Sequence, residues 1–173
     1  MTDLLPDATE IEIVSRGNRW QQSWHPPTAV PHGKPNGAAG ICVVESGELV
    51  IISNDEISWD FPAGRPEGEE DWEQTLRREV MEEACAEVTD ATLLGFARGR
   101  CVEGPEAGRT LVRSIWLARV RLNDWLPQFE IQHRKLVPFE QGISCVLPEY
   151  EPFWWRAFHE ARRAIAGGGR AAG

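Results

Sequence analysis

The sequence predicts one α/β domain over residues 1–166. The chain has 173 residues, of which 42% are hydrophobic and 26% charged, and these values are typical of a globular protein with a single hydrophobic core. Short runs rich in β-branched residues alternate with two segments whose apolar residues recur with the period of an α-helix. No apolar run reaches the roughly 18 residues that cross a bilayer, so we expect no membrane partner.

The first third of the chain is predicted to form short strands. Residues 11–14 (IEIV) form the first one. The prolines within residues 24–36 predict a loop, because proline fits neither a helix interior nor an inner strand. The β-branched runs 38–44 and 49–53 are separated by the turn-forming residues 45–48, which is typical of a hairpin.

The rest of the chain is predicted to contain two helices and further strands. Asp71 is the expected N-cap of a helix over residues 72–86, with Gln74 as its capping partner. A second helix is predicted over residues 151–166, where aromatic residues and alanines form one apolar stripe. Strands are predicted at 92–97, 110–122 and 131–139, a loop at 102–108 and a disordered tail at 167–173.

The chain is acidic, with 27 acidic and 18 basic residues and a net charge of −9. This is the wrong sign for a surface that binds nucleic acid, so we expect no such partner. An acidic protein that binds a phosphate-bearing ligand must supply local cations, either arginines or metal ions. The four cysteines lack zinc-type spacing and the N-terminus lacks a signal-peptide pattern, so we expect reduced thiols and a cytoplasmic location.

Carboxylates cluster on the first predicted helix. Glu79 and Glu83 are four residues apart and share a helix face, and Glu82 lies next to that face. Like charges this close require a cation, and Mg²⁺ prefers oxygen ligands. Leu76 and Val80 follow a neighbouring line that can pack on the sheet and hold the acidic face in place. The alternative is that the three glutamates are the solvated face of a surface helix.

The spacing of this segment resembles the Nudix box. Residues 64–86, GRPEGEEDWEQTLRREVMEEACA, follow the pattern GX5EX7REUXEEXGU, in which U is a bulky aliphatic residue. Cys85 replaces the last glycine of the pattern and Ala86 replaces its last aliphatic residue. Because residues 85–88 contain no helix breaker, we expect the helix to run on through Cys85; the alternative is a strained turn there. Cys85 is not expected to be a nucleophile, because no histidine lies near it in sequence.

The resemblance implies a Nudix-type α/β/α sandwich with a mixed β-sheet. It also implies a hydrolase that uses Mg²⁺ or Mn²⁺ to cleave the diphosphate linkage of a small-molecule nucleoside diphosphate derivative. The sequence Pro62-Ala63-Gly64 is similar to the variant common among enzymes that act on ADP-ribose and ADP-sugars. A phosphoric anhydride gains negative charge at its bridging oxygen as it breaks, so bound cations suit this chemistry.

By the same resemblance, the box residues take specific roles. Glu79 and Glu83 would bind the metal together with the backbone carbonyl of Gly64. Glu82 would be a further ligand, or would orient or deprotonate the attacking water. Arg78 and Glu70, the other two charged residues of the pattern, would pair with each other and position the box.

Members of the family often draw one more carboxylate from a later loop. Glu130, which precedes a strand-like stretch, is the expected residue, with Glu103 and Glu106 as competitors and a surface glutamate as the plain alternative. Trp20 and Trp24 could stack on a base, or pack in the core. Candidate phosphate ligands are Arg65, Arg98, Arg100, Arg109 and Arg113, whereas His25, His32, His133 and His159 are expected to be structural.

Two other functions compete with the hydrolase. One is a non-catalytic Nudix-fold module that binds or senses a nucleotide, with the altered Cys85 and Ala86 as the mark of lost catalysis. The other is an isomerase of isoprenoid diphosphates, which the lack of a paired cysteine and glutamate outside the box disfavours. Because every carboxylate of the box is present, we favour the enzyme. A homodimer is left open.

Overall fold

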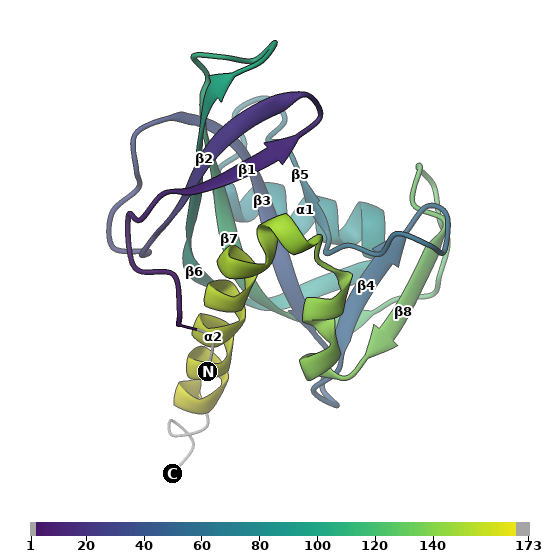
Figure 1. The fold of residues 1–173 in the computed structure, drawn as a ribbon. Coiled ribbons are helices and arrows are strands. Elements are labelled where there is room, and N and C mark those ends of the chain that lie inside the picture. Colours follow the sequence, from purple (N-terminus) through teal and green to yellow (C-terminus); the bar gives the residue numbers. More distant parts are fainter. Residues whose placement is uncertain (1–2, 169–173) are drawn as a thin grey trace.

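The structure, a computed structural model, describes residues 3–168, and its strands form one eight-stranded sheet (Figure 1). The strands are β1 (Ile11–Ser15), β2 (Asn18–His25), β3 (Lys34–Val43), β4 (Leu49–Ser53), β5 (Ala63–Gly64), β6 (Ala86–Glu103), β7 (Thr110–Leu122) and β8 (His133–Val137). They are ordered β1-β2-β6-β7-β3-β4-β8, and the short β5 pairs with β3. β3 and β7 run parallel, whereas the other paired strands run antiparallel. The predicted mixed sheet is therefore confirmed.

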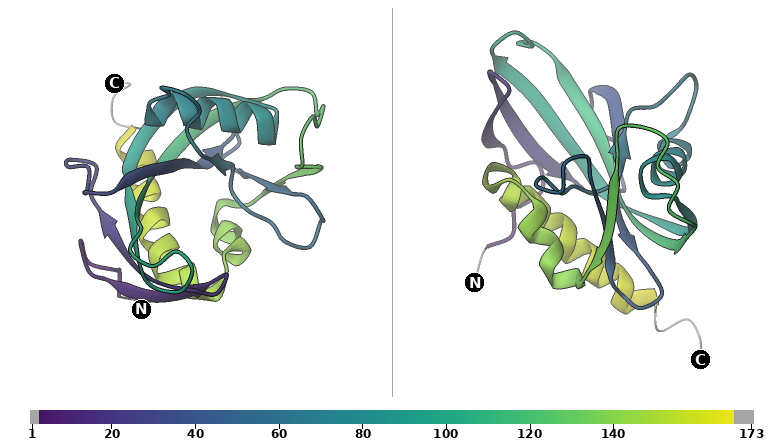
Figure 2. Two further views of the ribbon diagram at one scale, coloured as in Figure 1. Left: turned by 90° about the horizontal axis from the view of Figure 1, so that it is seen from above. Right: turned by 90° about the vertical axis from the view of Figure 1, so that its right-hand side faces the viewer.

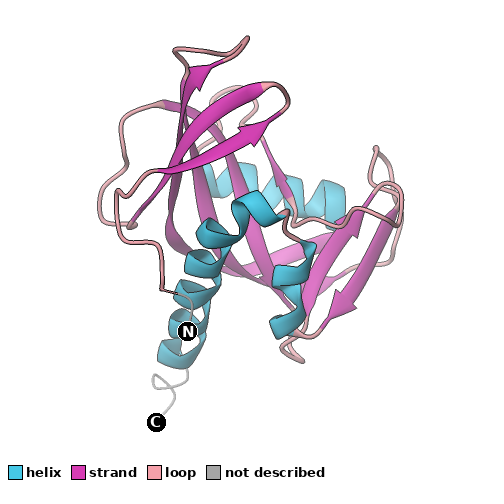
Figure 3. Cartoon of the chain, viewed as in Figure 1, coloured by secondary structure: helices cyan, strands magenta, loops and turns pink. Residues whose placement is uncertain are grey.

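Two helices cover opposite faces of this sheet. α1 (Trp72–Ala84) packs on one face through Leu76 and Val80, and α2 (Glu151–Gly168) packs on the other through Phe153 and Phe158 (Figure 2). All four of these side chains are almost fully buried. The short 3-10 helices η1 (Phe139–Cys145) and η2 (Pro148–Tyr150) lead into α2 (Figure 3). The layers form the α/β/α sandwich that the resemblance implied.

The predicted proline-rich loop is shorter than expected. Its first two residues belong to β2, and its end belongs to β3, which begins at Lys34 and contains Pro35. The register between β3 and β7 shifts between Pro35 and Gly37, so the proline lies at an irregularity where a missing N–H is tolerated. β2 was not predicted, because its sequence NRWQQSWH is mostly polar. It is a strand because it pairs with β1 on one side and β6 on the other.

The prediction that the first helix runs through Cys85 is wrong, and the alternative of a strained turn is correct. α1 ends at Ala84, and Cys85 has φ 47° and ψ 50°, the left-handed conformation. β6 begins at the next residue, so the chain must reverse direction here. Arg134 Nη1 donates to the carbonyl oxygens of Ala84 at 2.8 Å and Cys85 at 3.0 Å, which satisfies two carbonyls at the helix end.

The other end of α1 was predicted correctly. The Asp71 side chain accepts a hydrogen bond from the Gln74 backbone N–H at 2.8 Å, and the Gln74 side chain accepts one from the Asp71 N–H at 2.9 Å. This reciprocal pair is the capping box that the sequence indicated.

The C-terminal helix is longer than predicted. α2 continues to Gly168, two residues beyond its expected end at residue 166, and the rest of the predicted tail, residues 169–173, lies outside the described residues. Between residues 3 and 168, no helix combines the length and the apolar character needed to span a membrane.

Candidate active site

A cleft of about 260 Å³ lies beside α1 and is lined mainly by carboxylates. Glu79, Glu82 and Glu83 reach it from α1, and Glu130 reaches it from the loop between β7 and β8. The predicted additional carboxylate therefore lies beside the three from the box. The other lining residues are Glu67, Arg78, Phe129 and Ile131. Phe129 and Ile131 were missed from the sequence, although they flank Glu130 directly.

The short strand β5 holds two of these carboxylates in position. The Ala63 N–H donates to Glu83 Oε2 at 2.9 Å. Gly64 lies against Glu79 so closely that a Cβ on this glycine would be 1.8 Å from Glu79 Oε1. No side chain larger than hydrogen fits there, so Gly64 creates the space that the Glu79 carboxylate occupies.

Arg78 lies at the centre of the acidic cluster. Its Nε and Nη2 donate to the two carboxylate oxygens of Glu70 at 2.8 and 3.1 Å, so the predicted ion pair is present. Its Nη1 also donates to Glu79 Oε1 at 2.9 Å and to Glu82 Oε2 at 3.0 Å. These two contacts were not predicted, because the sequence does not show which way the guanidinium turns. The hydrogen bonds from Arg78 lower the pKa of Glu70 to about 2.

Two cleft carboxylates have raised pKa values, Glu83 and Glu79. Burial raises the pKa of Glu83 to about 7, and repulsion from Glu79, Asp60 and Glu130 adds to this, while the Ala63 N–H opposes it. Burial also raises the pKa of Glu79, against the opposing effect of Arg78. Both shifts mean that the negative charge of these carboxylates is unfavourable unless a cation is close.

The donor set fits a hard divalent cation. Every candidate ligand offers a carboxylate or carbonyl oxygen, which is the chemistry that Mg²⁺ and Mn²⁺ prefer, and the space at Gly64 keeps one carboxylate in place. Across residues 3–168, no three acidic, histidine or cysteine side chains already converge in the arrangement of a finished metal site. In this conformation Arg78 instead contacts Glu79 and Glu82.

The competing candidates lie elsewhere. Glu103 pairs with Arg19, and Glu106 pairs with Arg109, both away from the cleft. Trp24 is fully buried and packs against a phenylalanine of α2, so the core interpretation is correct for it.

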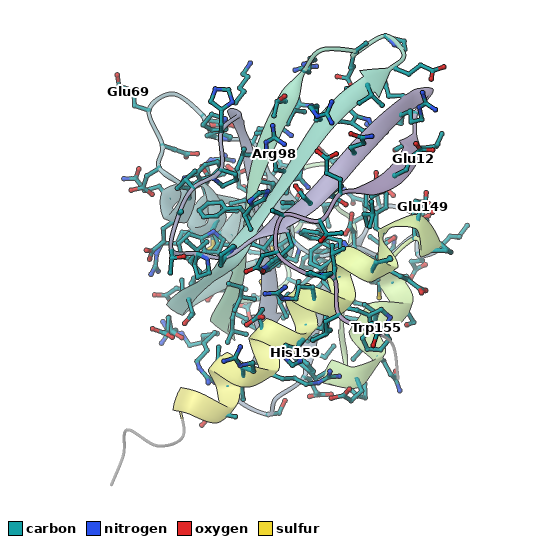
Figure 4. The ribbon with its side chains drawn as sticks, turned by 60° about the vertical axis from the view of Figure 1, so that its left-hand side comes forward. Glu12, Glu69, Arg98, Glu149, Trp155 and His159 are labelled. Atoms are coloured by element: carbon teal, nitrogen blue, oxygen red, sulfur yellow. The ribbon has the colours of Figure 1, made fainter. Side chains whose placement is uncertain are left out.

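The four histidines, all of them among the described residues, lie outside the cleft lining. His25 hydrogen-bonds with Ser23, His133 is 3.4 Å from Glu56, and the carbonyl of His32 accepts from Arg98. His159 lies on α2 (Figure 4), which packs on the face of the sheet opposite α1. Their positions agree with structural roles.

The five candidate arginines divide into two groups. Arg98 and Arg100 pair with Glu10, and Arg109 has the partner already named. Arg65 and Arg113 have no hydrogen bond or ion pair from their side chains to any residue in the described part of the chain. Burial lowers the pKa of Arg113, which means that its charge is partly desolvated.

Comparisons with known proteins agree with this geometry. The family model of the NUDIX domain matches residues 33–153. No curated protein sequence shows significant similarity. The structure is similar to that of the Bacillus subtilis pyrophosphohydrolase BsRppH, with a TM-score of 0.64, 20% identity, and coverage of 89% of this chain and 97% of that chain.

Two further solved structures share the fold. One is an ADP compounds hydrolase, with a TM-score of 0.55, 16% identity and coverage of 99% of both chains. The other is the NUDIX domain of Shewanella oneidensis NrtR complexed with ADP ribose, with a TM-score of 0.56, 13% identity, and coverage of 80% of this chain and 92% of that chain. At these identities the similarity concerns the fold.

Proposed function

The chain belongs to the NUDIX domain family and is a Nudix hydrolase, and on this premise we propose that it cleaves the diphosphate linkage of a nucleoside diphosphate derivative with Mg²⁺ or Mn²⁺. The observation that carries this proposal is the convergence of five glutamates on one cleft: three from α1, Glu67 from the loop before α1, and Glu130 from the loop before β8. A solvated helix face would not bury its carboxylates or pack one of them against a glycine.

The proposed roles follow from the positions of the residues. Glu79 and Glu83, with the Gly64 carbonyl, would hold the metal ion, and Glu130 would complete the set from the loop between β7 and β8. The ion, when bound, supplies positive charge to the reacting diphosphate. Arg78 Nη1 donates to Glu79 Oε1, so metal binding through that oxygen would require it to exchange the guanidinium for the ion.

Glu82 is the proposed group that orients or deprotonates the attacking water. Its side chain is 33% exposed, compared with 12% for Glu79, so it is the more accessible of the two to a water molecule. In the reaction, the water oxygen forms a bond to one phosphorus and the bond from that phosphorus to the bridging oxygen breaks. One water is consumed, and two phosphate monoesters leave. Arg78, fixed by Glu70, would keep the helix carboxylates aligned.

The proposed substrates are ADP-ribose and related sugar nucleotides. The sequence Pro62-Ala63-Gly64 supports this choice, as do the fold neighbours described as an ADP compounds hydrolase and as a complex with ADP ribose. The net charge of −9 argues against nucleic acid as the substrate. The four free cysteines support a cytoplasmic location.

The test is a panel of nucleotides and nucleotide sugars incubated with purified protein and Mg²⁺, with release of monophosphate as the readout. Glu82→Gln should lower turnover at least about a hundredfold without unfolding the protein. The matched control is Glu73→Gln, which changes a carboxylate of the same helix that pairs with Arg77 outside the cleft. Saturable binding without turnover across the whole panel would support the sensor module instead.

A further inference from the structure

Arg113 lies on the face of the sheet opposite α1. In the strand register it stands beside Ala97 of β6, which stands beside Trp24 of β2. Trp24 and Ala97 belong to the core under α2, and residues directly across paired strands point to the same face. Arg113, on β7, therefore also lies on the α2 side of the sheet.

This arginine is partly buried without a partner. Its guanidinium makes no hydrogen bond and no ion pair within 4.0 Å to any of residues 3–168. The charged or polar groups that act on it from a greater distance are Asp60, Arg65, Tyr150 and Glu83. A partly buried cation is normally paired, so this one has capacity for an anion that is not part of the protein.

Two glycines bring Arg113 close to the carboxylate cleft. Gly37 is its neighbour on β3, and a Cβ on Gly37 would be 3.2 Å from Arg113 Nε and 2.5 Å from the Gly64 carbonyl oxygen. Gly64 in turn lies against Glu79. Arg113 Nε therefore lies beside the backbone of Gly37, which adjoins the Gly64 carbonyl, and Gly64 adjoins the Glu79 carboxylate.

The sheet surface beyond Arg113 carries an unsatisfied polar atom. In the next cross-strand row, Gly99 of β6 stands beside Gln22 of β2. Gly99 carries no side chain, and the partly buried Trp20 ring lies 3.4 Å from where its Cβ would be. Gln22 Oε1 is buried without a hydrogen-bond partner among the described residues. A buried amide oxygen is normally satisfied, so this atom also indicates a missing ligand group.

We propose that Arg113 binds a phosphate group of the substrate, so that the diphosphate lies across Gly64 with the carboxylate cleft on one side and the Arg113 guanidinium on the other. The nucleoside end then extends over Gly99 toward Trp20 and Gln22. This inference rests on the proposed function, because it takes a nucleoside diphosphate derivative as the ligand. Arginine suits the role, since its planar fork can donate two hydrogen bonds to one phosphate.

The test separates binding from hydrolysis. ADP and inorganic pyrophosphate are titrated calorimetrically into metal-free protein in EDTA, and hydrolysis of ADP-ribose is measured with Mg²⁺ in parallel. Arg113→Met should weaken ADP binding at least about tenfold, because a charge-assisted hydrogen bond is lost. Arg113→Lys should lie between this variant and the wild type, since it keeps the charge but loses the fork.

The matched control is Arg119→Met. Arg119 lies on the same strand, is exposed and is about 20 Å further along β7, so ADP affinity should stay within about twofold. Arg113→Met should melt no lower than the wild type, because it removes an unpaired, partly desolvated cation. If it fails to fold, Arg113→Lys alone decides the outcome.

The possible failures are distinguishable. If the wild type hydrolyses no panel member but Arg113→Met loses ADP binding, the proposed function fails and the phosphate site stands. If Arg113→Met binds ADP and turns over ADP-ribose like the wild type, the phosphate site is refuted and the hydrolase stands. If the wild type binds neither ADP nor pyrophosphate, the phosphate site is also refuted.

Discussion

Replacing Cys85 by glycine and, separately, by alanine measures the strain at the end of α1. Both changes remove the same thiol, which is 9% exposed with its Sγ 3.6 Å from the Leu126 carbonyl oxygen. Both variants therefore lose the same thiol contacts, and the difference between their free energies of unfolding reports on the backbone conformation at residue 85. The left-handed conformation destabilises the fold by about 1–2 kcal/mol when the residue has a Cβ, and glycine avoids this penalty. Glycine also makes the unfolded chain more flexible, which offsets part of the gain.

The expected difference is about 1 kcal/mol in favour of Cys85→Gly over Cys85→Ala. For a chain of this size it corresponds to a melting temperature roughly 2–4 °C higher for the glycine variant. Urea denaturation followed by circular dichroism gives both free energies of unfolding, and equal m-values would show that the denatured states are comparable.

The opposite order would refute the argument. Inside a helix, glycine is less stable than alanine by about 1 kcal/mol, so a more stable Cys85→Ala would mean that α1 continues through this position in solution. Hydrolytic activity should stay within a few fold in both variants, because Glu79, Glu82 and Glu83 precede the change. Loss of activity would show that the turn itself sets the geometry of the carboxylates.

Three further predictions concern the same helix and its charges. Millimolar Mg²⁺ should raise the melting temperature of the wild type by binding the folded form, and Glu83→Gln should remove most of that rise in a thermal-shift titration. In EDTA, the folded protein takes up a proton at Glu83 as the pH falls through about 7, whereas the unfolded chain does so near 4.5. As the pH falls from about 8 to about 5, the free energy of unfolding of the wild type, measured relative to Glu83→Gln in urea titrations, should therefore increase by about 2 kcal/mol. This value is smaller than the full pKa shift would give, because the carboxylate is partly exposed. A difference between the two proteins that does not change with pH would contradict the raised pKa. Arg134→Met should lower the free energy of unfolding by about 2 kcal/mol, because the Ala84 carbonyl loses its charged donor. The control Lys135→Met removes an exposed cation over Trp59 and should lower the free energy of unfolding by less than about 1 kcal/mol in the same urea titration.

The parts of the site that share one helix were predictable from the sequence. Helical periodicity alone puts Glu79, Glu82 and Glu83 side by side, and the cap at Asp71 fixes where that helix begins. The strands at 49–53 and 110–122 were also predicted with their observed bounds, because β-branched composition is a local property of the sequence.

The parts that depend on distant contacts were not predictable. β2 is a strand because β1 and β6 provide its hydrogen-bond partners, and its polar sequence does not show this. The turn at Cys85 is stabilised by Arg134, which lies far along the chain and gives no local indication of its contact. The second set of contacts made by Arg78 depends on how tightly β5 packs on α1, and no spacing rule reports that.

The parallel pairing of β3 with β7 has a consequence for folding kinetics. β6 and β7 are consecutive and antiparallel, so their hairpin closes over a short loop, whereas β3 must find β7 across more than a third of the chain. The entropy of closing that large loop is lost before the parallel contacts form, so this step should be slow. α1 packs on Ala38 and Cys42 of β3, and therefore docks only after β3 is in place. A refolding chain should regain most of its strand content while it is still inactive, and the carboxylate cleft should be among the last regions to form.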